Sequence, residues 1–344
     1  MLARPDTDPG PHAVPTTTNA MLTWDYERTN GPLVRLCERA KQLQWDAADL
    51  PWEIDVDQER DAVTSVLTNG FATSFDRAGT PFEHWGKSDW TLLGIEAQNW
   101  MLSQFLHGEQ GALLCTAKLA FAVPSIDAKH YAATQAVDEA RHVEVFARYL
   151  DEKLSGHYPI NTHLGALLDD IISDARWDVT FLGMQVLVEG LALAAFGAIR
   201  VLAHEPLLEE LLRRVMADEA RHVAFGVVSL AQHYDELTSA ELRDRQEFTY
   251  QAIVRMQDRF LMQEVWERFG IDAEDGARLM RSTPEYAMFQ HMLFSRIVPN
   301  CRKLGLLDAS DGWLRQRFTE VGIVAFEHCT DAEQEAQLDE LLLS

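Results

Sequence analysis

The same five-residue sequence, Asp-Glu-Ala-Arg-His, occurs at residues 138–142 and again at residues 218–222. In an α-helix, residues i and i+3 lie on one face. The glutamate and histidine of each copy therefore point in the same direction and can reach one metal ion together. A Glu-x-x-His pair on each of two helices is characteristic of a dinuclear metal site inside a four-helix bundle. The repeat therefore predicts a helical bundle built around such a site.

Two more glutamates complete the expected ligand set. Glu109 and Glu189 each lie 30 residues before the glutamate of one pentapeptide. Glu109 lies between Leu106 and Leu113-Leu114, and Glu189 lies within a run of valine, leucine and alanine. A buried acid is costly unless it is paired or metal-bound. Four carboxylates, two neutral imidazoles and two divalent ions sum to zero charge, which lowers the cost of burying them. The predicted ligands, with Glu109 and Glu189 completing or bridging the pair of ions, are Glu109, Glu139, His142, Glu189, Glu219 and His222.

Several alternatives stay open at this point. Glu96 competes with Glu109, although the matched spacing favours Glu109. Asp138 and Asp218 are expected to accept a hydrogen bond from the histidine of the other hairpin, braced by Arg141 and Arg221; ordinary surface ion pairs are the alternative. Ligands rich in carboxylate favour iron or manganese over a closed zinc site. The other histidines are solvated or hydrogen-bonded, or one is an extra ligand: His107, His130, His163 and His204.

The chain reads as two helical hairpins with a connector. The expected helices are residues 89–123, 125–154, 174–203 and 206–234, with prolines at positions 124 and 206 as breaks. Further helical patterns follow at about 239–269, 284–304 and 311–326. Residues 1–20, rich in Pro and Thr, are predicted to be a disordered tail. The prediction is one helical domain, 21–344, with the dimetal bundle at about 89–235.

Composition and charge limit the functional classes. A net charge of −24 opposes binding to nucleic acid and to anionic membranes. The apolar residues 181–199 contain Gln185 and Glu189, which favours a core helix over a membrane span. Four dispersed cysteines and no recognisable signal peptide favour a reducing, cytoplasmic location.

Over residues 90–234 the chain resembles the ferritin-like dimetal-carboxylate superfamily. Its repeated pentapeptide is most similar to those of bacterial multicomponent monooxygenase hydroxylases, p-aminobenzoate N-oxygenase-type enzymes and acyl-carrier-protein desaturases. The resemblance implies an all-α, ferritin-like four-helix bundle with additional N- and C-terminal helices. It also implies two iron ions (Fe2+/Fe3+), with manganese as the alternative at one or both positions. Phe146 stands where ribonucleotide reductase small subunits carry a radical tyrosine, which disfavours radical storage.

The resemblance implies an O2-dependent oxidoreductase of biosynthetic metabolism. N-oxygenation of an amine-type nitrogen or C–H hydroxylation of a small organic substrate is expected, with electrons from an external reductase or ferredoxin. A ferroxidase or iron-binding protein, an acyl desaturase and a helical interaction protein with a vestigial site are the alternatives. Bundles with surplus amphipathic helices often form homodimers. The substrate pocket is expected one helical turn from the ligands, although core packing explains the same residues: Leu106, Ala112, Leu113, Phe146, Gln185, Val186, Ala192, Leu193 and Phe225.

Overall fold

The structure is a computed structural model that describes residues 12–60, 77–202 and 205–329. Every regular element in these ranges is a helix, which confirms the all-α prediction. Of the predicted N-terminal tail, residues 12–20 form no helix or strand, and residues 1–11 lie outside the described part.

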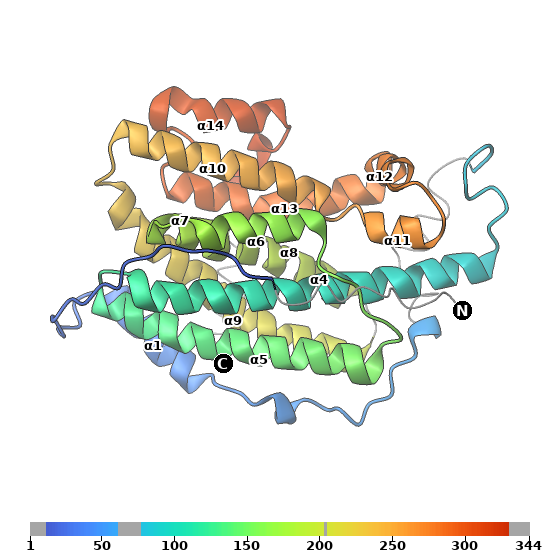
Figure 1. Cartoon of the computed structure of the whole chain (residues 1–344), viewed down its shortest axis with the longest axis horizontal. Helices are drawn as coiled ribbons and strands as arrows, with labels where there is room; N and C mark the ends of the chain where they lie inside the picture. The colour runs from blue at the N-terminus through green and yellow to red at the C-terminus, as the bar shows by residue number, and fades with distance from the viewer. Residues whose placement is uncertain (1–11, 61–76, 203–204, 330–344) are drawn as a thin grey trace.

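Four long helical segments form the centre of the molecule (Figure 1). The first hairpin pairs α4 with α5, and the second pairs α8 with α9. The bounds are α4 Lys87–Ala122, α5 Ile126–Lys153, α8 Glu189–Leu202 and α9 Pro206–Tyr234.

Local sequence explains where these helices begin. The Ser125 side chain accepts a hydrogen bond from the backbone N–H of Ala128, which caps α5 after the break at Pro124. Glu205 caps α9 in the same way, and Pro206 occupies its first position. The second helix of each hairpin therefore starts at a cap that the sequence encodes locally.

The third segment departs from the regular α-helix predicted for residues 174–203. It consists of α7 (Trp177–Phe181), the π-helical segment η2 (Leu182–Val188) and α8. The backbone N–H of Glu189 bonds to the carbonyl of Met184, five residues back. Such π-turns are frequent at functional sites. The continuous run Trp177–Arg200 is long and apolar enough to cross a membrane, but 89% of its most apolar window is buried, as expected for a core helix.

Gly226 allows η2 to lie close to α9. A Cβ on Gly226 would lie 2.7 Å from the Cβ of Gln185, which cannot rotate away. We expect Gly226→Ala to destabilise the fold by about 1–3 kcal/mol, because the two segments would have to separate. Urea unfolding of the metal-free protein measures this loss. Gly190→Ala is the matched control, since a Cβ there meets Ile297 at an ordinary 3.9 Å; an equal loss in both variants would contradict the close-approach argument.

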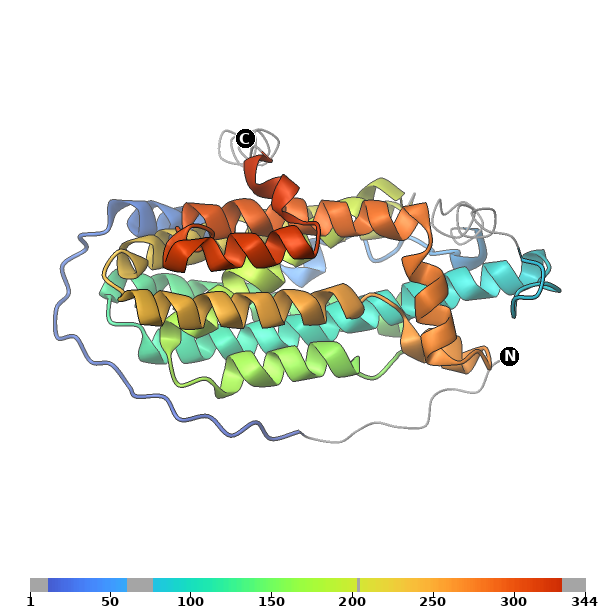
Figure 2. The ribbon, with the colours of Figure 1, turned by 90° about the horizontal axis from the view of Figure 1, so that it is seen from above.

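The remaining helices cover the bundle. α10, α13 and α14 form a layer over one side (Figure 2), while α1 packs against α5 and α9. Residues 239–269 do not form the single helix predicted, because Met262 adopts a left-handed conformation (φ 54°) that separates α10 from α11. The bounds are α1 Gly31–Gln42, η1 Ala47–Asp49, α6 Thr162–Ser173, α10 Ser239–Asp258, α11 Gln263–Arg268, α12 Ala273–Arg281, α13 Pro284–Lys303, α14 Ala309–Glu320 and η3 Val324–His328.

Candidate metal centre

The six side chains predicted as metal ligands meet in the middle of the bundle, and none is more than 5% exposed. Hairpin geometry brings Glu109 and Glu139 together, because each lies 15 residues from Pro124 in the turn. Residues equally distant from the turn of an antiparallel pair lie at the same level. The 30-residue spacing in the sequence therefore corresponds to one level of the bundle.

The cluster contains two groups of possible metal ligands that share two glutamates. One group is Glu109, Glu139, His142 and Glu219, and the other is Glu139, Glu189, Glu219 and His222. Within each group the candidate ligand atoms lie within 4.8 Å of one another. Each group could hold one ion, and Glu139 and Glu219 belong to both groups.

The distances fit this arrangement. The Nδ1 atom of His142 lies 3.5 Å from Glu139 and 3.1 Å from Glu219. The Nδ1 atom of His222 lies 3.1 Å and 3.4 Å from the same two carboxylates. Ligand atoms about 2.1 Å from one octahedral ion are about 3 Å apart. Glu109, 3.2 Å from His142, belongs to one group, and Glu189 belongs to the other.

Several ligand atoms approach only other members of the cluster. Both carboxylate oxygens of Glu219, one oxygen each of Glu139 and Glu189, and Nδ1 of His222 are buried without a hydrogen-bond partner among the described residues. Leaving buried polar atoms unpaired is costly. Metal ions at the cluster would satisfy these atoms, so the residues present fit a dimetal cofactor.

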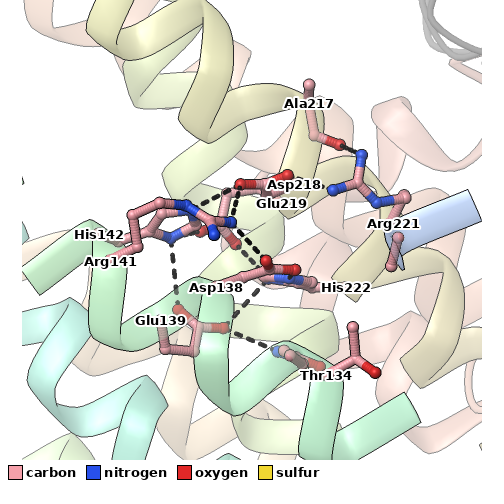
Figure 3. A network of polar contacts seen from close by, with 12 residues as sticks. Thr134, Asp138, Glu139, Arg141, His142, Ala217, Asp218, Glu219, Arg221 and His222 are labelled. Carbon is pink, nitrogen blue, oxygen red and sulfur yellow. Dashed lines mark hydrogen bonds and ion pairs between the residues drawn. The ribbon is translucent and has the colours of Figure 1, made fainter. Parts of the chain in front are cut away.

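Two aspartates hold the outer nitrogen atoms of the histidines (Figure 3). Asp218 Oδ2 lies 3.1 Å from Nε2 of His142, and Asp138 Oδ2 lies 3.4 Å from Nε2 of His222. Each aspartate thus reaches the histidine of the other hairpin. When Nε2–H donates to a carboxylate, the neutral imidazole carries its lone pair on Nδ1. This lone pair is directed into the cluster, where it can bind a metal ion.

The aspartates are in turn held by charged and polar side chains. Arg141 bonds to Asp138 and lies 3.2 Å from Asp218, while Arg221 bonds to Asp218. Trp45 donates its indole N–H to Asp218 at 2.8 Å. Arg141 and Arg221 thus contact the aspartates they were expected to brace.

Three side chains that contact this network were not anticipated from the sequence: Gln44, Trp45 and Gln135. Gln44 donates to Asp138 at 2.9 Å, and it comes, like Trp45, from the segment after α1. Gln135 donates to Glu139 at 2.9 Å and to Glu189 at 3.0 Å. Gln135 could have been found, because it precedes Glu139 by one helical turn. Gln44 and Trp45 carry no such local signal.

Protonation in the metal-free cluster reflects crowding of four acids. Burial and the charge of Glu219 raise the pKa of Glu109 to about 8. Burial, with Glu139 and Glu219, also raises the pKa of Glu189. Burial acts in the opposite direction at His142 and His222, but the surrounding carboxylates outweigh it and raise both pKa values. The cluster therefore holds protons that divalent ions would displace.

The rival residues lie elsewhere. Glu96 accepts a hydrogen bond from Tyr158 at 2.7 Å and pairs with Arg268, which leaves Glu109 as the acid of α4 in the cluster. His107 contacts the carbonyl of Tyr158 at 2.9 Å, and His204 lies outside the described residues.

The predicted pocket residues divide by burial. Five are buried: Ala112, Phe146, Gln185, Val186 and Phe225. Four are partly exposed: Leu106, Leu113, Ala192 and Leu193.

A helical bundle with a buried cluster of four carboxylates and two imidazoles defines a ferritin-like dimetal-carboxylate protein. The model of the family described as P-aminobenzoate N-oxygenase AurF matches residues 122–305, or 184 of the 344 residues. The chain belongs to this p-aminobenzoate N-oxygenase family and is an oxygen-dependent oxidoreductase. The matched range begins after Glu109, so it does not include this predicted ligand.

Solved structures share the fold. An R2-like ligand-binding oxidase, a point mutant with an anaerobically reconstituted Mn/Fe cofactor, is 18% identical and has a TM-score of 0.55. Another R2-like ligand-binding oxidase, with an aerobically reconstituted metal cofactor after photoconversion, is 17% identical and has a TM-score of 0.54. Each comparison covers 82% of this chain and 95% of the other. No match was found among the curated proteins searched.

Proposed function

We propose that this protein is a non-haem diiron N-oxygenase that oxidises an amine-type nitrogen of a small organic substrate. The buried cluster of four glutamates and two histidines carries the proposal, because several of its ligand atoms have no hydrogen-bond partner among the described residues. We assign the two metal ions to Glu109, Glu139, His142, Glu189, Glu219 and His222. The family description names an N-oxygenase, and manganese at one position is the alternative suggested by the Mn/Fe cofactor of the similar oxidase.

The proposed reaction consumes dioxygen, two electrons and two protons and converts R–NH2 into R–NHOH and water. Two bound iron ions supply the means of reducing dioxygen, and an external donor such as a ferredoxin or reductase restores the electrons. Asp138 and Asp218 orient the histidines through their outer nitrogen atoms. Gln135 restrains Glu139 and Glu189 by donating to both.

The two ends of the cluster are lined by different side chains, and this difference supports one end as the position of the substrate nitrogen. Beyond His142, the rings of Phe105, Phe146 and Phe196 pack together with centroids 4.7–6.2 Å apart. In the opposite direction along the bundle, Gln185 lies one turn before Glu189, and both ends of its buried amide lack a partner among the described residues. An amide can accept from N–H and donate to a new N–O group. We place the nitrogen at the Gln185 end.

The activity is tested by a single turnover. The chain is loaded anaerobically with two equivalents of iron, reduced, mixed with 4-aminobenzoate and oxygen, and the products are analysed by mass spectrometry. The proposal expects the hydroxylamine or a more oxidised nitrogen product. A ring-hydroxylated product would select C–H hydroxylation, and continued iron oxidation without an organic product would select a ferroxidase.

Replacing Gln185 tests the placement of the nitrogen. We expect Gln185→Leu to lower the single-turnover rate with 4-aminobenzoate about tenfold, because one buried hydrogen bond to the substrate is lost. Iron content measured by elemental analysis should stay at the wild-type level. An unchanged rate would show that the substrate nitrogen does not contact Gln185.

A further inference from the structure

Most of the exposed large apolar side chains gather in one region of the surface. Within the described residues, and with one exception on α10, they lie in residues 21–26 and on the outer face of the α4–α5 hairpin. On the hairpin, Leu114, Phe121 and Val137 are each more than half exposed. The backbone N–H of Met21 donates to the carbonyl of Phe121 at 3.1 Å, which joins the two parts of this region. Exposed apolar surface that gathers in this way marks an interaction surface.

The exposed positions of the hairpin form two stripes with helical spacing. They recur at intervals of three and four residues in both helices, so each stripe follows one face of its helix. α4 and α5 pack side by side (Figure 1), while α6 packs against α4 and α1 against α5, which leaves the stripes uncovered between these flanking helices. The two stripes are called the hairpin face below. Its exposed residues are Gln110, Leu114, Ala117 and Phe121 on α4 and His130, Ala133, Val137 and Ala140 on α5.

The hairpin face carries no acidic residue, lysine or arginine, although such residues make up 24% of the chain. The lysines of the same stretch, Lys118 and Lys129, donate to backbone carbonyls, at 2.9 Å to Ile172 and at 3.2 Å to Ala120. The net charge of −24 makes two copies of the chain repel each other over most orientations. At the hairpin face no carboxylate would meet a carboxylate, so this face is one where two copies can approach closely.

Side-chain size alternates in opposite order along the two stripes. The central positions of α4 are large, small and large, and those of α5 are small, large and small. In chain order these residues are Leu114, Ala117 and Phe121 on α4 and Ala133, Val137 and Ala140 on α5. A two-fold axis that lays α4 of one copy on α5 of the other places large side chains opposite small ones, and it does so twice. The hairpin face is therefore complementary to itself.

We propose that the hairpin face binds a second copy of this chain, with α4 of each copy packed against α5 of the other. The absence of charge and the alternation of large and small side chains carry the proposal. The core of a protein interface is depleted in charged residues, as this face is. Residues 21–26, bonded to Phe121 at the end of α4, extend the contact beyond the hairpin.

Sedimentation equilibrium of the iron-loaded full chain tests the proposal. At micromolar concentration the wild type should have a mass of about 78 kDa, twice the 39.0 kDa of one chain. We expect Val137→Glu to raise the dissociation constant of the dimer about 100-fold or more, because a two-fold interface buries the new carboxylate twice. Leu114→Glu, in the other stripe, should have the same effect.

Val254→Glu is the matched control. It introduces the same side chain at the exposed valine of α10, outside the hairpin face, and should leave the dissociation constant unchanged. Because Val137 is exposed, Val137→Glu should keep the circular dichroism spectrum and the iron content of the wild type. A monomeric wild type would overturn the proposal. A dimer that persists in both stripe variants, or that Val254→Glu weakens equally, would also overturn it, because the contact would then lie elsewhere.

Discussion

Replacing Glu139 with alanine is expected to abolish binding of both metal ions, whereas replacing Glu109 with alanine should remove only one. Glu139 lies 3.5 Å from Nδ1 of His142 and 3.1 Å from Nδ1 of His222, so its carboxylate could serve both proposed metal positions. Glu109 reaches only the position next to His142. Elemental analysis after anaerobic iron loading and desalting should give two ions per chain for the wild type, none for Glu139→Ala and one for Glu109→Ala.

The approximate two-fold relation of the hairpins extends this prediction. Glu219→Ala should behave like Glu139→Ala, and Glu189→Ala should behave like Glu109→Ala but lose the ion next to His222. Glu144→Ala is the control, since Glu144 is an exposed acid on α5. Full metal content in Glu139→Ala, or loss of both ions in Glu109→Ala, would show that the bridging and terminal roles are assigned wrongly.

Removing the carboxylate of Asp218 is expected to be the most destabilising single change outside the ligands. Asp218 accepts hydrogen bonds from Trp45 and Arg221 and contacts His142 and Arg141. In Asp218→Ala, Arg221 retains the carbonyl of Ala217 as its acceptor but loses its charged partner. Breaking a buried ion pair by removing one partner costs about 3–5 kcal/mol, because the other charge stays buried.

Urea unfolding of the metal-free protein measures this loss, so that altered metal binding does not contribute. Trp45→Phe removes one hydrogen bond to the same aspartate and should cost only about 1 kcal/mol. Asp275→Ala removes an exposed aspartate paired with Arg278 and should cost at most about 1 kcal/mol. A loss in Asp218→Ala no larger than that in Asp275→Ala would mean that the aspartate does not hold the network together.

The helices that the sequence predicted well have strong local signals. The fourth helix of the bundle was expected at residues 206–234, and α9 spans Pro206–Tyr234 because a proline starts it and the apolar pattern is uninterrupted. The π-helical η2 and the break at Met262 were missed. No proline or glycine marks the break at Met262, and the one glycine inside η2, Gly183, does not distinguish a π-helix from an α-helix. The close packing of η2 on α9 depends on Gly226, which lies in the partner helix of the hairpin.

The sequence by itself determined the class of site. The repeated pentapeptide and its matched upstream glutamates required only helical periodicity and hairpin geometry, which are local properties of the chain. The same reasoning predicted that Asp138 and Asp218 would each reach across to the other histidine, as their contacts with His222 and His142 show.

Only the tertiary structure decided which groups surround that site. It brought Glu139 and Glu219 within 3.5 Å of both imidazoles, and it brought Trp45 to Asp218 across 173 residues. Contacts between distant segments depend on how whole helices pack against each other, and no periodicity within one helix encodes that packing.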